Sequence, residues 1–380
     1  MSIEQNLRED TMITNDLGYD YLGRVARARQ LMREQDVDAL YVTAGPTMTY
    51  FTGFSAYSGG WPLCLSVIFV PQSGEPTFIL SDMHADILEA KGGSWVKDVQ
   101  RYMDGDDPSS LLKNVLQRHG VLNGTVGVED NLWFGDHELI HSVAPHVHLR
   151  SAHPLVNRLR MVKDAGEIDA LRKASRICDA GFEAAIQAIR EGRPEYEAAL
   201  AINNAMLADG NEGMGVGGHF RTLETRLFQK GDIVDVDHGA TYRGYHSDTA
   251  RNVFVGQPTA EEERMYRVTV ECFDRTMEII KPGVLAEEVH RFAEAFMERH
   301  GLRQVWKIGH GVGLNHGHEA PYLQAGATFP LEEGMVFTID PGCFVSGKYK
   351  DTPIHVEDVV VVTDSSVETL THFTKDMVVV

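Results

Sequence analysis

Hydrophobic residues alternate between helix-like and strand-like spacing along the first 150 residues. From Tyr21 to about Gln35 the apolar residues recur at helical intervals, and the run ALYVTA that follows is typical of a buried strand. Two more apolar runs, at 63–70 and 76–82, are separated by PQSGE, whose proline and glycine indicate a turn. With the short run GTVGVED, this pattern predicts an α/β domain that contains a hairpin or an adjacent pair of strands.

The pattern changes near Asn157. From there to Gly192 the chain has helical periodicity and many strong helix formers, which predicts one long helix. A second helix is predicted for EYEAALAINNAMLADG and one more around 260–300, while the rest is typical of strands joined by glycine-rich turns. Because 380 residues exceed the size at which one core usually keeps growing, we expect two domains, 1–155 and 156–380, the second of mixed α and β structure.

Composition excludes several classes of protein. Hydrophobic residues make up 43% and charged residues 24%, as in ordinary globular chains. The net charge of -20 argues against binding to nucleic acid or to an anionic membrane. The N-terminus is polar and no run reaches the length of a membrane span, so we expect a cytoplasmic protein. The four cysteines lack the spacing of a zinc ribbon or a disulfide framework: Cys64, Cys178, Cys272 and Cys343.

Two aspartates lie on neighbouring strand segments of GDIVDVDHGATYRGYHSDTARNVFVG. The runs IVDVD and DTARNVFV are joined by a turn at TYRG, so the chain folds back and Asp237 can face Asp248. Like charges this close repel each other, and their coexistence on apolar strands indicates a cation between them. Solvated turn or edge positions are the alternative for this pair taken alone.

A second pair of acidic residues repeats this arrangement near the C-terminus. Asp340 ends the apolar strand in GMVFTIDPG, and Glu357 begins another in IHVEDVVVVT. A carboxylate beside four valines is costly to bury without a partner, which indicates a ligand or a salt bridge. Asp358 is expected on the opposite face of this strand, as a solvated or capping residue.

One histidine, His310, lies between these hairpins in WKIGHGVGLNHGHEAPYL. The flanking glycines let the backbone approach a ligand, although a lone histidine in such a loop is more often structural. Four carboxylates with one imidazole suit Mn²⁺, Co²⁺, Fe²⁺ or Zn²⁺, and four negative charges are balanced better by two ions than by one. The predicted ligands of two divalent metal ions are Asp237, Asp248, His310, Asp340 and Glu357.

From about residue 157 onward, the chain resembles the pita-bread metallohydrolases, which include methionine aminopeptidase, aminopeptidase P and prolidase. The resemblance rests on DHGATYRGYHSDTAR, GHGVGLNHGHEAP, GMVFTIDPG and HVEDVVVVT, which occur in the family's order. RARQLMREQDVDALYVT and MTYFTGF resemble the creatinase-like N-terminal domain of the prolidase and creatinase branch. The resemblance implies a creatinase-like α/β domain over 1–155 and a pita-bread α+β catalytic domain over 156–380.

The resemblance also implies the mechanism and the assembly. In this family a water or hydroxide that bridges the two metal ions attacks the scissile carbonyl, and the carboxylate of Asp340 would assist proton transfer. His219 corresponds to a histidine that contacts the substrate, and His318 to one that hydrogen-bonds the oxyanion of the tetrahedral intermediate. A homodimer is implied, in which Tyr57 or Trp61 could reach a neighbouring active site.

The chain departs from the family around the expected site. Asp340 stands where the family usually has glutamate, Trp306 where prolidases and aminopeptidases P have a further histidine, and His355 where they have arginine. The loop between His310 and His318 carries an extra residue, with His316 also close by. These differences indicate retained metal chemistry with altered specificity.

Three functions remain open from the sequence. The leading one is a Xaa-Pro peptidase of the prolidase or aminopeptidase P type, which would cleave a C–N bond in a short peptide. The alternative is a non-peptidase of the same fold that acts on a small amide, a cyclic amidine or a lyase substrate. A binding protein without catalysis is the third, and it is disfavoured because all five metal-ligand donors are kept.

Overall fold

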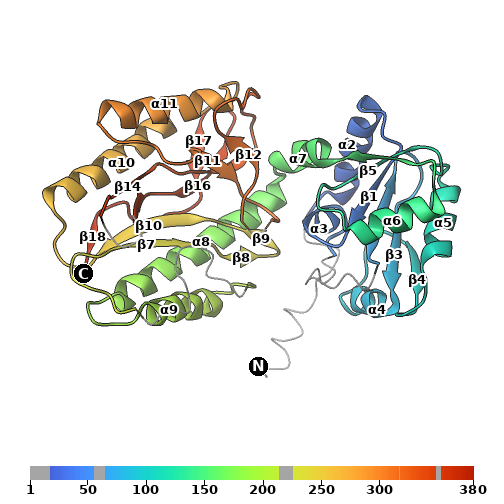
Figure 1. The fold of residues 1–380 in the computed structure, drawn as a ribbon, viewed down its shortest axis with the longest axis horizontal. Helices are drawn as coiled ribbons and strands as arrows, with labels where there is room; N and C mark the ends of the chain where they lie inside the picture. Colours follow the sequence, from blue (N-terminus) through green and yellow to red (C-terminus); the bar gives the residue numbers. More distant parts are fainter. Residues whose placement is uncertain (1–17, 55–64, 214–225, 316, 348–351) are drawn as a thin grey trace. The chain divides into compact units, whose positions relative to one another are not determined.

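The computed structural model describes residues 18–54, 65–213, 226–315, 317–347 and 352–380 (Figure 1). The chain divides into two compact units, Met1–Arg160 and Met161–Val380. Within the described ranges, no helix is both long and apolar enough to cross a membrane. Several residues considered above lie outside the described ranges: His219, His316, Tyr57, Trp61 and Cys64.

The N-terminal unit is built on a six-stranded mixed sheet with the order β4-β3-β2-β1-β5-β6. Its elements are α2 (Tyr21–Glu34), β1 (Ala39–Thr43), α3 (Pro46–Thr52), β2 (Val67–Pro71), β3 (Thr77–Ser81), α4 (Asp82–Ala90), β4 (Asp98–Tyr102), α5 (Ser109–Arg118), β5 (Thr125–Val128), α6 (Phe134–Val143), β6 (His148–Ser151) and α7 (His153–Met161). The central strands are buried, and a core forms between this sheet and helices α5 and α6. The predicted strand pair is confirmed, because β2 and β3 are antiparallel neighbours.

The C-terminal unit combines four helices and two larger sheets among its described residues. Its elements are α8 (Ala165–Ala188), α9 (Glu195–Ala208), β7 (Ile233–His238), β8 (Thr241–Tyr242), β9 (Tyr245–His246), β10 (Thr249–Phe254), α10 (Ala260–Ile279), α11 (Ala286–Arg299), β11 (Gly309–Gly311), β12 (Glu319–Leu323), β13 (Val336–Ile339), β14 (Gly342–Phe344), β15 (Pro353–His355), β16 (Asp358–Val362), β17 (Val367–Thr369) and β18 (Val378–Val379).

The strands of this unit lie between two pairs of helices (Figure 1). Helices α8 and α9 share a hydrophobic core with the sheet β18-β10-β7, and α10 and α11 share another with the sheet β12-β11-β13-β16-β17. Each helix pair thus buries one face of a sheet. Polar side chains lie at the strand ends, between the two sheets. The expected class is confirmed, an α/β domain followed by an α+β pita-bread domain.

The predicted single helix from Asn157 to Gly192 is wrong. The structure has two helices, α7 and α8, and α8 ends at Ala188. Asp164 begins α8 with a capping box, in which its carboxylate accepts a hydrogen bond from the Glu167 amide and the Glu167 carboxylate accepts one from the Asp164 amide, each at 2.9 Å. This reciprocal capping starts a new helix inside a segment whose composition alone favours a continuous one.

The single helix predicted around 260–300 is also two helices, α10 and α11. The turn between them contains Pro282, which lacks an amide hydrogen and clashes with the preceding helical turn. Thr259 caps the start of α10, and the Glu262 carboxylate accepts a hydrogen bond from the Thr259 amide at 2.7 Å. The two helices thus pack against each other as a hairpin over the five-stranded sheet.

Thr259→Ala removes the side-chain cap of α10. We expect a loss of about 1 kcal/mol in the free energy of unfolding of the C-terminal unit, because the hydroxyl that accepts a hydrogen bond from the Glu262 amide is lost. Urea unfolding followed by circular dichroism measures this loss. Thr328→Ala, at an exposed threonine outside any helix, is the matched control and is expected to change stability by less than about 0.5 kcal/mol. Equal effects of the two substitutions would contradict the capping role.

Candidate active site

The first hairpin brings Asp237 and Asp248 together. Strands β7 and β10 are antiparallel, with Asp237 opposite Ala250 and Asp248 directly before β10. In the connection, Arg243 and Gly244 have φ of 52° and 78°, the positive values that a type I′ turn requires. Carboxylate oxygens of both aspartates lie within 4.8 Å of each other and of Glu357.

The second hairpin contributes Asp340 and Glu357, and β11 contributes His310. Strand β13 lies between β11 and β16. Asp340 follows β13, Glu357 precedes β16 and His310 is the middle residue of β11, so the three residues are close in space. One ligand atom from each of His310, Asp340 and Glu357 lies within 4.8 Å of the other two. The five predicted metal ligands therefore form two groups of three that share Glu357.

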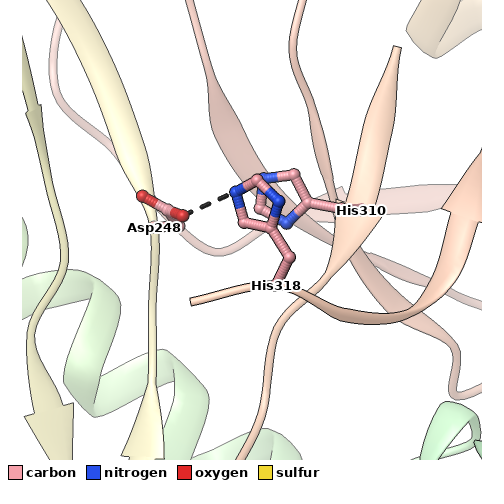
Figure 2. Close-up of side chains that lie close together, drawn as sticks. All are labelled: Asp248, His310 and His318. Atoms are coloured by element: carbon pink, nitrogen blue, oxygen red, sulfur yellow. Dashed lines mark ion pairs between the residues drawn. The ribbon is translucent and has the colours of Figure 1, made fainter. Parts of the chain in front are cut away.

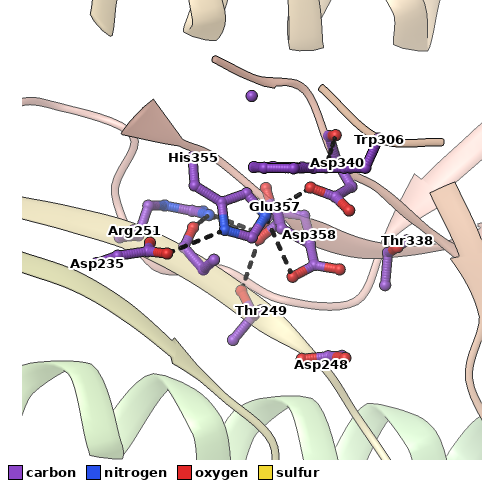
Figure 3. A network of polar contacts seen from close by, with 12 residues as sticks. Asp235, Asp248, Thr249, Arg251, Trp306, Thr338, Asp340, His355, Glu357 and Asp358 are labelled. Carbon is purple, nitrogen blue, oxygen red and sulfur yellow. Dashed lines mark hydrogen bonds and ion pairs between the residues drawn. The ribbon is translucent and has the colours of Figure 1, made fainter. Parts of the chain in front are cut away.

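A backbone bridge joins the two hairpins. The Glu357 amide donates to the Ala250 carbonyl at 3.0 Å, and the Ala250 amide donates to the Glu357 carbonyl at 3.3 Å. The Thr249 hydroxyl also donates to the Glu357 carbonyl, at 2.7 Å (Figure 3). Since Ala250 lies opposite Asp237, this bridge fixes the separation of the two pairs of carboxylates.

The donor set fits divalent cations. His310 Nδ1 lies 3.3 Å from the Gly311 carbonyl, which can only accept, so the proton is assigned to Nδ1 and the lone pair to Nε2. That lone pair faces Glu357 Oε1 at 3.2 Å and Asp248 Oδ2 at 3.9 Å. Glu357 Oε1 is buried and accepts no hydrogen bond from any described residue. Two carboxylate oxygens and an imidazole nitrogen that face one another at these distances fit the environment of a bound cation.

Burial and mutual repulsion act on the same carboxylates. Desolvation, together with the charges of Glu357 and Asp237, raises the pKa of Asp248 well above its usual range. Desolvation and the charge of Asp340 raise the pKa of Glu357 in the same way. The raised pKa values favour the protonated carboxyl groups when no cation is bound, so cation binding and proton release are coupled.

His318 stacks on His310, with ring centroids 3.6 Å apart, and Asp248 faces the two rings (Figure 2). His318 Nδ1 lies 3.2 Å from Lys307 Nζ, an ammonium that can only donate, so the histidine proton is assigned to Nε2. Burial, followed by the charges of His310 and Lys307, lowers the pKa of His318 to about 4. His318 is therefore a neutral hydrogen-bond donor at the edge of the ligand set.

His355 connects Asp340 to a fifth acidic residue, the buried Asp235 (Figure 3). His355 Nε2 lies 2.5 Å from Asp340 Oδ1, and His355 Nδ1 lies 3.5 Å from Asp235 Oδ2. Burial alone would lower the pKa of His355, but the charges of Asp340 and Asp235 raise it well above its usual range. The Asn252 side chain accepts a hydrogen bond from the His355 amide at 2.7 Å, and this bond fixes the backbone of His355.

The expectation that Asp358 is a solvated or capping residue is wrong. Its side chain is fully buried, where its Oδ1 accepts hydrogen bonds from Arg251 and Thr371, each at 2.7 Å, and Lys375 pairs with its Oδ2. Arg251 also donates to the Glu357 carbonyl at 2.7 Å. The opposite face of β16 is covered by the chain near its C-terminus, which is why a buried ion pair stands where solvent was expected.

Sequence reasoning missed Asp235 and Lys307. Asp235 lies two residues before Asp237 on β7, and period-two alternation, which places both on one face, could have identified it. No sequence pattern identifies Lys307, because its proximity to His318 depends on how β11 pairs with β12.

Models of known families match both units. The model described as the creatinase/prolidase N-terminal domain matches residues 24–162, and the model described as metallopeptidase family M24 matches residues 169–364. The two matches follow one another along the chain without overlap. They correspond to the resemblances found in the sequence motifs.

Whole-chain comparisons agree with these matches. The chain is 31% identical to a probable dipeptidase PepE from Mycobacterium tuberculosis, over 95% of this chain and 96% of that protein. It is 26% identical to a Xaa-Pro dipeptidase from Pyrococcus furiosus, over 93% and 99% of the two chains. The crystal structure of a prolidase from Thermococcus sibiricus superposes with a TM-score of 0.85 at 27% identity, over 95% of this chain and all of that one.

Removal of metal should make stability depend on pH. The pKa values of Asp248 and Glu357 are raised in the folded protein, so over the range between their ordinary and raised values the folded chain binds more protons than the unfolded chain. The stabilising contribution of these two groups is therefore lost as the pH rises above their ordinary pKa values of 3.8 and 4.5, by roughly 1.4 kcal/mol per unit of raised pKa. Thermal unfolding after chelation, between pH 5 and pH 8, measures this loss.

Asp248→Asn provides the control for this measurement. The variant removes one of the repelling charges, so we expect the metal-free variant to be more stable than the metal-free parent at pH 8 and nearly equal to it at pH 5. Metal binding, measured by calorimetry, should be lost in the variant. A metal-free parent as stable at pH 8 as at pH 5 would contradict the assignment of repelling buried carboxylates.

The order of the motifs, the convergence of the five predicted metal ligands and the whole-chain similarity point to the same family. The matched family consists of metallohydrolases, and the site contains the donors that such chemistry needs. The chain belongs to metallopeptidase family M24, with a creatinase/prolidase-type N-terminal domain before its catalytic domain.

Proposed function

We propose that this enzyme hydrolyses the peptide bond before proline in dipeptides or short peptides. The observation that carries the proposal is the pair of metal-ligand groups that share Glu357, next to the neutral donor His318. The substrate class is supported by relatives named Xaa-Pro dipeptidase and prolidase, which match nearly the whole chain.

Two divalent cations are proposed at the shared site. Asp237 and Asp248 would hold one cation, His310 and Asp340 the other, and Glu357 both. Four carboxylates outnumber one imidazole, which favours a hard ion, and we propose Mn²⁺ ahead of Co²⁺, Fe²⁺ or Zn²⁺. When bound, the cations supply Lewis acidity towards the scissile carbonyl and lower the pKa of water at the site.

We assign separate roles to the side chains around the proposed cations. His318, neutral and protonated on Nε2, would donate a hydrogen bond to the oxygen that gains charge when the scissile carbonyl is attacked. Asp340 would accept the proton of the attacking water and later deliver it to the leaving amine. His355 would keep Asp340 oriented during both transfers. His219, outside the described residues, is proposed to contact the substrate.

We also propose that the enzyme acts in the cytoplasm as a homodimer. The cysteines that the structure describes, Cys178, Cys272 and Cys343, are buried free thiols, which suits a reducing compartment. The homodimer is supported by the resemblance to the prolidase branch.

Peptide hydrolysis tests the proposed function. Metal-free protein is reloaded with Mn²⁺, Co²⁺, Fe²⁺ or Zn²⁺ and given a panel of Xaa-Pro dipeptides and Xaa-Pro-Xaa tripeptides, with Xaa-Ala peptides as controls. We expect cleavage before proline that requires metal and is undetectable in Asp248→Ala, because that variant removes a ligand from one cation. Stoichiometric metal binding without cleavage of any peptide would refute the proposal and direct the search to small amides and cyclic amidines, the substrates of the alternative function.

Substitutions at His355 test whether it orients Asp340. His355→Ala should lower kcat about ten- to a hundredfold, with a smaller change in KM, because Asp340 loses its hydrogen-bond partner. His355→Arg restores the residue that the family usually has and should recover much of kcat when combined with Asp340→Glu. His290→Ala, on α11, is the matched control. Steady-state kinetics of all variants on one Xaa-Pro dipeptide measures these effects, and an unchanged kcat in His355→Ala would exclude the orienting role.

A further inference from the structure

Lys307 places a positive charge beside the candidate active site. It lies three residues before His310, on the segment that enters β11, and its side chain is partly buried. Its Nζ lies 3.2 Å from His318 Nδ1 and 5.6 Å from the centre of the Tyr322 ring. Tyr322 in turn lies opposite His310 in the pairing of β11 with β12. One imidazole ring thus separates this ammonium from the ligand set.

Three other described cations of the C-terminal unit are paired with acidic side chains. Arg251 pairs with Asp358 at 2.7 Å, and both are buried. Lys163 pairs with Glu319 at 3.0 Å, with side-chain exposures of 1% and 5%. His355 pairs with Asp340 as described above. These charges compensate acidic residues within the protein, so they are not available to bind an anionic ligand.

Lys307 forms no such pair with a described carboxylate. An ammonium has three N–H donors, and one of them serves His318 Nδ1. The aromatic face of Tyr322 attracts the cation at 5.6 Å but does not neutralise it. Two donors and a full positive charge therefore remain to bind an anion next to the residue that would bind the scissile carbonyl.

A dipeptide carries an anion at the matching place. The carbon of its C-terminal carboxylate is three covalent bonds from the scissile carbonyl carbon, and each additional residue would move the carboxylate away by up to about 3.3–3.6 Å. A cation beside His318 can therefore approach the carboxylate of a dipeptide, whereas each further residue increases the separation of the carboxylate from the scissile carbonyl.

We propose that Lys307 binds the C-terminal carboxylate of the substrate and makes the enzyme selective for dipeptides. This inference rests on the proposed function, since it specifies which Xaa-Pro substrates the site accepts. Lys307 is assigned as a specificity-determining residue, and it also fixes the protonated nitrogen of His318. The two roles have different kinetic consequences, because carboxylate binding acts only on substrates that carry the charge.

Neutral substrate analogues separate these roles. The Mn²⁺-loaded enzyme is given Ala-Pro and its amide, Ala-Pro-NH2, which lacks only the negative charge. We expect kcat/KM to be about ten- to a hundredfold higher for the dipeptide, the size of effect that a charge-assisted hydrogen bond produces. Lys307→Met should remove most of this preference through a higher KM for Ala-Pro, while any loss that acts through His318 should lower kcat/KM for both substrates by the same factor. Lys307→Arg should keep the preference, since it keeps the charge.

Binding of the product provides a readout independent of turnover. L-proline should bind the Mn²⁺-loaded enzyme at least about tenfold more tightly than L-prolinamide in calorimetry, and Lys307→Met should abolish the difference. Lys281→Met, at an exposed lysine after α10, is the matched control and should behave as the parent. Equal loss of activity on both substrates in Lys307→Met would overturn the proposal and leave Lys307 as a positioning residue for His318.

The parent enzyme alone can also decide the question. Equal kcat/KM values for Ala-Pro and Ala-Pro-NH2 would overturn the role of Lys307 and leave the Xaa-Pro peptidase function intact. Absence of cleavage of every proline peptide, with metal bound, would overturn both. These two failures are therefore distinguishable without any variant.

Discussion

The repulsion between acidic side chains buried in one small volume is the constraint on which the catalytic unit depends. The ionised forms of Asp237, Asp248, Asp340 and Glu357 repel one another there, and burial weakens the screening that water would provide. The fold places these carboxylates on strand ends and adjacent residues, where the backbone is fixed and the charges cannot move apart. Such an arrangement stores unfavourable electrostatic energy in the metal-free protein and releases it when cations bind.

The protein compensates charge outside the ligand set with its own residues. Arg251 neutralises Asp358, Lys163 neutralises Glu319, and His355 is shared between Asp340 and Asp235. Each of these pairs also holds backbone or a side chain of the site, because Arg251 binds the Glu357 carbonyl and Glu319 accepts a hydrogen bond from the Asn315 amide in the His318 loop. The acidic residues paired with arginine or lysine form the support, and the predicted ligands face the space proposed for the cations.

The sequence predicted the class of the fold and the strands of the site well, because both depend on local periodicity. Asp237 and Asp248 on a tight hairpin, and Asp340 and Glu357 at the ends of apolar runs, follow from spacing and turn residues. The sequence did not predict the break before α8, because that break depends on reciprocal side-chain capping. It also did not predict the burial of Asp358, because a segment distant in the sequence covers β16. Lys307 could not be found, since only the pairing of β11 with β12 brings it to His318. The metal-binding roles of the five ligands remain predictions.

The pairing of β10 with β18 has a consequence for the folding of the catalytic unit. β10 begins directly after Asp248 and is flanked on one side by β7 and on the other by β18, whose Val378 and Val379 lie beside Val253 and Phe254. Arg251 of the same strand is also tied to the Phe373 and Thr374 carbonyls. The sheet that carries Asp237 is therefore complete only when the C-terminal segment has paired with β10. Folding of this part of the catalytic unit thus depends on contacts between residues more than 100 positions apart in the sequence.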